Sequence, residues 1–221
     1  MKLPGLVIKI NDPDQGAPPN RGIPAGSDRT GEAVNALAVL CQAASVPRLV
    51  ARLGNASPSL GQALPPARCH GAPAINIGSY LMGGADQVAY GTLAHELAHH
   101  EAGDLAANGR ARVRIFLTFI AVFALTAFIP VISRYSVVFT LAVFAVLAAY
   151  QGQVSVRRQE YRADARGAEL LDAAGYPGTE CMTALLAGFG HESRVKQYAI
   201  AAVTGHPPVS RRLAAMRKRA S

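Results

Sequence analysis

Two apolar stretches in the middle of the chain limit most strongly how it can fold. Residues Ile115–Ile132 are 18 uncharged positions, nearly all apolar. As a helix rising about 1.5 Å per residue they would span about 27 Å, close to the thickness of a bilayer's hydrocarbon core. The second stretch, Val137–Tyr150, is shorter, and the tyrosines Tyr135 and Tyr150 at its ends suit the two membrane interfaces. The pattern predicts a transmembrane helical hairpin.

The charges around the two stretches predict an orientation. The turn between them has only Arg134, whereas six arginines flank the hairpin, namely Arg110, Arg112, Arg114, Arg157, Arg158 and Arg162. Because arginine-rich flanks stay on the cytosolic side, we expect an integral membrane protein, in the cytoplasmic membrane if bacterial, with both flanks in the cytosol. The alternative is a buried helical hairpin in a soluble domain, since the second stretch alone has a length that core helices share.

Composition excludes several other classes of protein. The chain has 221 residues, of which 50% are hydrophobic and 16% charged, so it is not intrinsically disordered. Its net charge of +8 comes from scattered arginines without interleaved aromatic residues, so no nucleic-acid partner is expected. The cysteines Cys41, Cys69 and Cys181 form no C-x-x-C motif, and we interpret them as ordinary thiols in a reducing compartment.

Outside the hairpin the periodicities predict an α+β fold that is mostly helical, with a small sheet. The predicted strands are Gly5–Ile10, at an edge, Arg48–Leu53 and Ala72–Met82, with a loop over Asn55–Arg68. The predicted helices run from near Gly31 to about Ser45, over Gln87–Glu101 with an end near Gly103, and over Glu160–Leu171, Cys181–Phe189 and Arg211–Arg219.

One helix carries a motif with a specific chemical meaning. In His95-Glu96-Leu97-Ala98-His99 two histidines lie one helical turn apart, so both imidazoles can bind a single Zn²⁺ ion. Glu96, beside the first ligand, is placed to act as general base on a zinc-activated water. His100 cannot share this face, and we expect it to face solvent or to donate a hydrogen bond from outside the ligand set.

A catalytic zinc ion needs a third protein ligand and leaves the fourth position for water. The remaining histidines, His70, His191 and His206, are candidates, as are the few carboxylates. Glu160 and Asp164 are the most informative, because positions i and i+4 lie on one helical face. Glu160 can then bind the metal while Asp164 accepts the N–H of a ligand imidazole. The two apolar segments support this set, since a hairpin returns the chain to the side that it left.

These motifs resemble those of the HtpX-like and CAAX prenyl protease-like zinc metallopeptidases, family forty-eight of the metallopeptidases and part of the gluzincins. The resemblance covers roughly Thr30–Met216. It rests on three ordered motifs: His95-Glu96-Leu97-Ala98-His99-His100 with Gly103-Asp104, Glu160-Tyr161-x-Ala163-Asp164-x-x-Gly167, and Thr204-Gly205-His206-Pro207-Pro208 with Arg212. It implies a zincin-type peptidase domain that a transmembrane hairpin interrupts.

The resemblance also implies a role for each site residue. His95, His99 and Glu160 would bind one zinc ion per chain, and Asp164 would orient a ligand histidine. Glu96, His206 and Arg212 would be catalytic: Glu96 activates water, His206 donates to the scissile carbonyl or the oxyanion, and Arg212 supports His206. From the residues alone, His206 would be only a turn histidine. The strand around Ala74–Tyr80 would be an edge that pairs with an extended substrate, with Asn55-Ala56 as an upstream element.

The sequence therefore predicts a membrane-anchored zinc endopeptidase whose substrates are proteins or peptides and whose active site faces the cytosol. Its expected parts are an N-terminal strand and loop (1–29), the first half of the peptidase domain (30–109), the hairpin (110–156) and the second half (157–221). Two alternatives are a catalytically silent zinc-binding membrane scaffold and a soluble metallopeptidase with a buried hairpin.

Overall fold

The computed structural model describes residues 6–10, 28–44, 46, 49–55, 61–64, 74–78, 86–127, 134–189 and 193–220. The helices are α1 (Asp28–Ala43), α2 (Asp86–Glu101), α3 (Asp104–Ala127), α4 (Arg134–Ala173), α5 (Gly178–Gly188), α6 (Arg194–Thr204) and α7 (Val209–Ala220). The strands are β1 (Leu6–Ile10), β2 (Leu49–Asn55), β3 (Gly61–Leu64) and β4 (Ala74–Gly78). The prediction of a mostly helical chain is confirmed.

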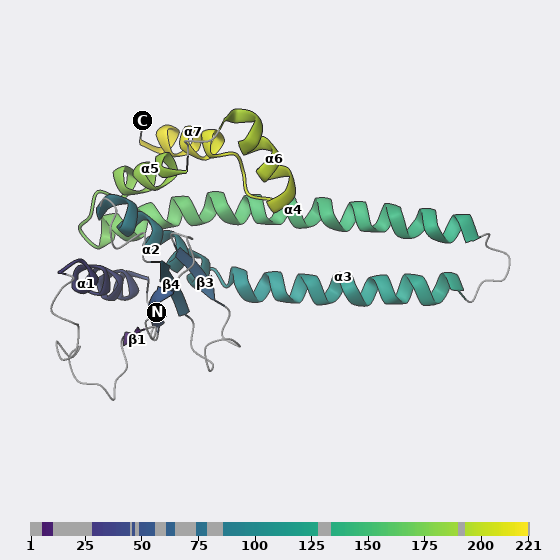
Figure 1. Cartoon of the computed structure of the whole chain (residues 1–221), viewed down its shortest axis with the longest axis horizontal. Coiled ribbons are helices and arrows are strands. Elements are labelled where there is room, and N and C mark those ends of the chain that lie inside the picture. The colour runs from purple at the N-terminus through teal and green to yellow at the C-terminus, as the bar shows by residue number, and fades with distance from the viewer. Residues whose placement is uncertain are drawn as a thin grey trace.

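Two helices give the molecule its elongated shape. α3 and α4 lie side by side and extend together from a compact region that holds the other elements (Figure 1). α4 has 40 residues, so the second apolar stretch and the segment with Glu160 form one continuous helix. Among the described residues, the part of α4 from Val138 to Ala173 is long and apolar enough to cross a membrane. Residues 128–132, the end of the first apolar stretch, lie outside the described residues.

The hairpin exposes its apolar side chains instead of burying them. Phe119 of α3 and Phe144 of α4 face each other, with ring centroids 6.4 Å apart. Most other large apolar side chains point outward; Phe116 is 62% exposed and Phe139 is 70% exposed. An exposed apolar surface this continuous marks a region that contacts a membrane or another protein.

The strands form one sheet in the order β1-β2-β4-β3. β1 lies at an edge, as predicted. The expectation that the strand around Ala74–Tyr80 forms an edge is wrong, because β4 pairs with β2 in parallel and with β3 antiparallel. The loop predicted over Asn55–Arg68 contains β3, whose Gly61-Gln62-Ala63-Leu64 sequence has little β propensity. Pairing with β4 makes this segment a strand.

The compact region is built around α2, which packs against α1, α4 and α5. Its core contains Leu93 and Leu97 of α2, Leu171 of α4 and Met182 and Leu185 of α5, all 2% exposed or less. Glycines permit two close helix contacts. A Cβ atom at Gly91 would lie 2.6 Å from the carbonyl oxygen of Cys181, and one at Gly167 would lie 3.3 Å from the backbone nitrogen of His95. The second contact holds α4 against the part of α2 that carries the histidines.

Candidate metal centre

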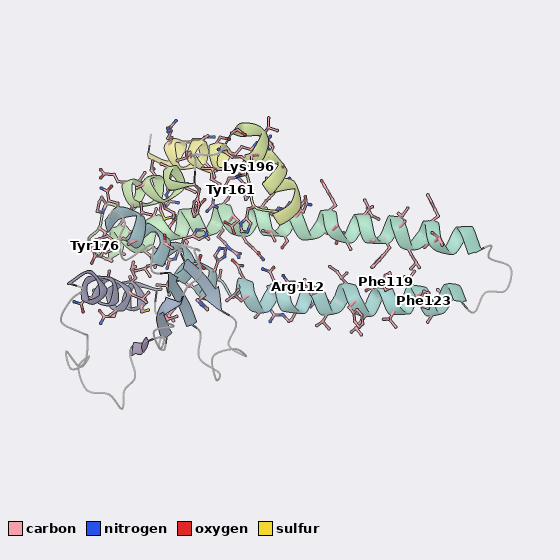
Figure 2. All side chains as sticks on the ribbon, viewed as in Figure 1. Arg112, Phe119, Phe123, Tyr161, Tyr176 and Lys196 are labelled. Atoms are coloured by element: carbon pink, nitrogen blue, oxygen red, sulfur yellow. The ribbon has the colours of Figure 1, made fainter. Side chains whose placement is uncertain are left out.

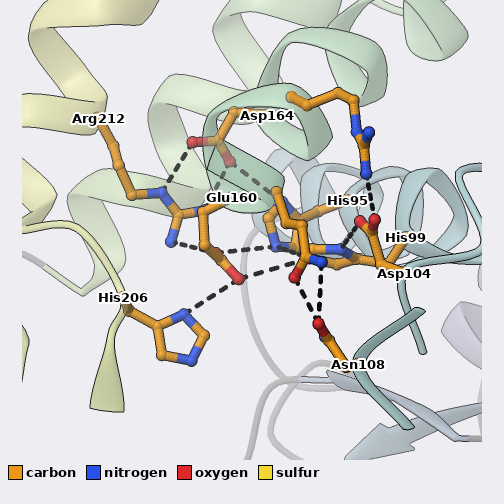
Figure 3. A network of polar contacts seen from close by, with 10 residues as sticks. His95, His99, Asp104, Asn108, Glu160, Asp164, His206 and Arg212 are labelled. Atoms are coloured by element: carbon orange, nitrogen blue, oxygen red, sulfur yellow. Dashed lines mark hydrogen bonds and ion pairs between the residues drawn. The ribbon is translucent and has the colours of Figure 1, made fainter. Parts of the chain in front are cut away.

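Three candidate ligands from two helices converge at the contact between α2 and α4. His95 and His99 lie one turn apart on α2, and their Nε2 atoms are 3.2 Å apart. Glu160 of α4 presents one oxygen to each: Oε2 lies 3.5 Å from Nε2 of His95, and Oε1 lies 3.5 Å from Nε2 of His99. Figure 3 shows the two rings and the carboxylate turned toward one another.

These separations fit a metal ion. Ligand atoms about 2.0–2.1 Å from a tetrahedral Zn²⁺ ion lie about 3.4 Å from one another. The two Nε2 atoms are 3.2 Å apart, and each lies 3.5 Å from a different oxygen of Glu160, so all three distances are close to that value. Two imidazoles and one carboxylate are also a donor set that zinc accepts, so the cluster can hold a metal ion.

A buried carboxylate lies behind His95. Oδ1 of Asp164 is 3.1 Å from Nδ1 of His95, an ion-pair contact whose angle is not that of a hydrogen bond. Arg212 of α7 clamps the same carboxylate: its Nε donates to Oδ2 at 2.7 Å and its Nη2 donates to Oδ1 at 2.6 Å. Asp164 is therefore fixed from one side by Arg212 while it faces His95 with the other.

A second carboxylate, which sequence reasoning missed, lies behind His99. Nδ1 of His99 donates to Oδ2 of Asp104 at 2.9 Å, which leaves the lone pair on Nε2. Arg162 of α4 binds the other oxygen of Asp104. Gly103 precedes Asp104 with a φ angle of +67° and turns the chain sharply between α2 and α3. The Gly103-Asp104 pair that follows the histidine motif is the signal that could have indicated this role.

Glu160 has two further contacts. Nη1 of Arg212 lies 3.0 Å from its Oε2 atom, and Nδ1 of His206 lies 3.1 Å from its Oε1 atom. Gly205 ends α6 in the left-handed conformation, close enough to α4 that a Cβ atom there would lie 3.4 Å from the Cα atom of Gln153, and His206 follows it beside Glu160. The His206 side chain is 53% exposed and Glu160 only 6%, so His206 lies on the open side of the cluster (Figure 3).

Burial and ion pairing oppose each other throughout the cluster. Burial disfavours the Glu160 anion, but His206, His95 and His99 outweigh it and hold the pKa of Glu160 far below its usual range. Burial also disfavours protonated His95, yet its contacts with Asp164 and Glu160 raise its pKa to about 9. Asp164 is buried too, and Arg212 followed by His95 keeps its pKa lowered. Glu160 and Asp164 are thus held as anions, and both lie beside the Arg212 guanidinium.

The positions of the other predicted residues follow from the same packing. Glu96 lies on α2 between the two histidines and is half-buried, as is His100. We expected Arg212 to support His206; the structure instead places its guanidinium on Asp164 and Glu160. His70 and His191 lie outside the described residues. Cys41 and Cys181 are buried thiols whose pKa values are raised, by burial first, to about 12 and about 11.

The comparison with protein families matches this architecture. The family model of peptidase family M48 covers residues 80–220, which include both histidines, Glu160 and the whole hairpin. The chain belongs to peptidase family M48. The resemblance inferred from the motifs is confirmed, and the protein is a zinc metallopeptidase with an H-E-x-x-H motif and a downstream glutamate. No curated protein and no solved structure matches the chain.

Proposed function

We propose that this M48 peptidase is a membrane-anchored endopeptidase in which His95, His99 and Glu160 hold one zinc ion. The observation that carries the ligand assignment is the convergence of the three side chains: the two Nε2 atoms lie 3.2 Å apart, and each lies 3.5 Å from one oxygen of Glu160. Asp104 and Asp164 support it, since each faces the Nδ1 atom of one histidine and so directs Nε2 toward the shared centre.

Glu96 is the general base of the proposed reaction. When bound, zinc lowers the pKa of water and polarises the peptide carbonyl. Glu96 accepts a proton from the attacking water and delivers it to the nitrogen of the departing amine, so the proton count balances at the end of the cycle. Its place on α2 directly after His95, with a half-buried side chain, supports this role.

His206 and Arg212 act on opposite sides of Glu160. His206 is half-exposed beside the ligand carboxylate, where its ring N–H can donate to the oxygen that becomes negatively charged in the transition state. Arg212 is only 8% exposed and holds Asp164 and Glu160. We therefore assign His206 as the group that touches substrate and Arg212 as a positioning residue.

β3 is the strand that we propose for substrate pairing. It lies at the edge of the sheet opposite β1 and contacts α2, the helix with the metal ligands. An extended peptide could pair with that edge through main-chain hydrogen bonds. This assignment replaces β4, which already has a neighbour on each side.

The hairpin of α3 and α4 would anchor this domain in a bilayer. Its outward-facing apolar side chains support insertion, and the arginines at its base support a cytosolic active site. Alkaline carbonate treatment of membranes tests the anchoring. We expect the full chain to remain in the pellet; release into the supernatant would show that the hairpin is instead covered by protein.

Metal content and proteolysis test the proposed chemistry. The full chain, purified in detergent, should bind about one zinc ion and cleave an unfolded protein such as casein. A chelator should stop cleavage, and added zinc should restore it. The His95→Ala variant should lose both the metal and the activity. One zinc ion per chain in that variant would overturn the ligand assignment.

A further inference from the structure

Two cavities lie along α3 and α4, and the first of them borders the metal centre at Asp104. The basal cavity, of about 570 Å³, is lined by Asp104, Tyr150, Ser155, Arg158 and Arg162, among others. The apolar cavity, of about 450 Å³, lies farther along the hairpin. Ala149 lines the apolar cavity and Tyr150 the basal cavity, so the two linings follow one another directly along α4.

The basal cavity is positively charged. Arg158 lines it, is exposed, and makes no ion pair or hydrogen bond with any residue that the structure describes. Arg162 also lines it and is 56% exposed, although it binds Asp104. Asp104 is the single carboxylate among the residues that line the two cavities, and His99 and Arg162 already occupy it. A ligand of this cavity would therefore meet an excess of guanidinium groups, which favours a phosphate.

The apolar cavity has one charged residue in its lining, Arg112, and is otherwise lined by apolar side chains. Arg112 is the residue of α3 in this cavity that lies nearest in sequence to the basal cavity. Farther along the hairpin the lining is aromatic and aliphatic, with Phe116, Phe119, Phe144 and Ala148. Figure 2 shows Arg112, Phe119 and Phe123 in this order along α3, from the compact region outward. The groove thus passes from charged to apolar in the direction of the predicted membrane.

We propose that the two cavities form one binding site for an anionic phospholipid. Arg158 holds the phosphate in the basal cavity, with Arg112 and Arg162 as further cationic neighbours, and an acyl chain lies along Phe116, Phe119 and Phe144. Tyr150 is 64% exposed at the junction, where an interfacial tyrosine is expected at headgroup depth. The site rests on the proposed membrane anchoring. A free phosphate ion would use only the basal half, so the adjoining apolar half favours a lipid.

Native mass spectrometry of the full chain in detergent tests the charged half. We expect wild type to retain phosphatidylglycerol about fivefold to tenfold better than phosphatidylcholine, since each arginine near a headgroup contributes modestly. Arg158→Gln should remove most of this preference. Arg110→Gln is the matched control, because Arg110 is also an exposed arginine of the hairpin base but lines neither cavity. Equal losses in both variants would overturn the site.

A second pair of variants tests the apolar half. Ala148→Leu adds bulk inside the apolar cavity and should lower retention of phosphatidylglycerol, whereas Ala142→Leu adds the same bulk to α4 outside both cavities and should not. Millimolar inorganic phosphate should not displace the lipid. Displacement by phosphate, or equal binding by Ala148→Leu and wild type, would overturn the assignment to a lipid.

Flotation with vesicles distinguishes a failure of the proposed lipid site from a failure of the proposed membrane anchoring. Wild type, Arg158→Gln and Arg110→Gln should all float with vesicles of phosphatidylcholine and phosphatidylglycerol. If all three float and wild type shows no preference in the detergent assay, the lipid site fails and the anchoring stands. If wild type does not float, the anchoring itself fails, and the site falls with it.

Discussion

The metal centre and the hairpin are built on opposite principles, although α4 runs through both. In the centre, Glu160 is held by four other side chains, namely both histidines, His206 and Arg212. In the outer hairpin, large side chains such as Phe139 and Leu125 point outward and are 70% and 66% exposed. In the metal centre, a side chain is positioned by its contacts with other side chains. In the outer hairpin, it is positioned by whatever surrounds the protein.

This contrast predicts how each region responds to substitution. A change in the centre removes a partner from several groups at once and leaves buried charges uncompensated, which is costly. A change on the outer surface of the hairpin removes little contact within the protein. Effects should therefore fall steeply from the cluster outward.

Glu96→Gln should give the largest effect on activity. The amide cannot accept the proton of water, so casein cleavage should fall by about 10²–10⁴-fold. Zinc content should stay near that of wild type, because Glu96 is not among the three converging ligands. Metal analysis beside a cleavage assay measures both quantities. Full activity in a zinc-loaded Glu96→Gln protein would remove Glu96 from the mechanism.

Asp104→Asn should give the next largest effect. The substitution removes the negative charge that His99 and Arg162 contact. Removing the carboxylate that holds a ligand histidine typically weakens metal affinity by about 10–100-fold. Competition with a zinc chelator of known affinity measures the change.

Glu101→Gln is the matched control for Asp104→Asn. Like Asp104, Glu101 pairs with an arginine of α4: it lies at the end of α2 and binds Arg166 with contacts of 2.6 and 2.7 Å, which this variant weakens. No ligand histidine contacts it, so zinc affinity should stay unchanged. Equal losses in the two variants would mean that helix packing, and not the orientation of His99, accounts for the effect.

These predictions also show where the sequence was informative. His95 with His99, and Glu160 with Asp164, could each be placed on one helical face, because a spacing of four residues defines such a face without any knowledge of tertiary structure. Joining the two pairs rested on the need of zinc for a third ligand and on the family resemblance. Asp104 was missed because its approach to His99 depends on the left-handed turn at Gly103. The contacts of Arg212 with Asp164 and Glu160 were not foreseen, because nothing in its local sequence indicates that α7 packs near Asp164.

The sheet shows the same limit. β1 was predicted as an edge strand from its short apolar run, which Lys9 interrupts. β4 was wrongly predicted as an edge, because the number of neighbours of a strand depends on segments far away in sequence. The short strand Gly61–Leu64 has little propensity of its own and becomes a strand only through pairing with β4.

Gly91→Ala should lower the stability of the compact region by disturbing the packing of α2 against α5. Alanine favours a helix over glycine by about 0.5–1 kcal/mol, but a Cβ atom here would lie 2.6 Å from the backbone carbonyl of Cys181. Overpacking of this kind typically costs about 1–3 kcal/mol, so the free energy of unfolding should fall. Gly109→Ala in α3 is the control: nothing lies within 4 Å of its Cβ position, so it should stabilise the protein slightly. Thermal unfolding in detergent compares them; stabilisation by Gly91→Ala would contradict the close contact of α2 with α5.

Phe139→Ala should have the smallest effect and tests the hairpin most directly. Because this ring is 70% exposed, its removal should change the free energy of unfolding in detergent by no more than about 0.5 kcal/mol and leave casein cleavage unchanged. Leu185→Ala in α5 removes a side chain that is 2% exposed and should cost about 2–5 kcal/mol. If Phe139→Ala were as destabilising as Leu185→Ala, the hairpin would be part of a packed protein interior, as in the soluble alternative. If Phe139→Ala is silent, replacing the same ring with Asp should lower retention in carbonate-washed membranes, because a charge then faces the hydrocarbon.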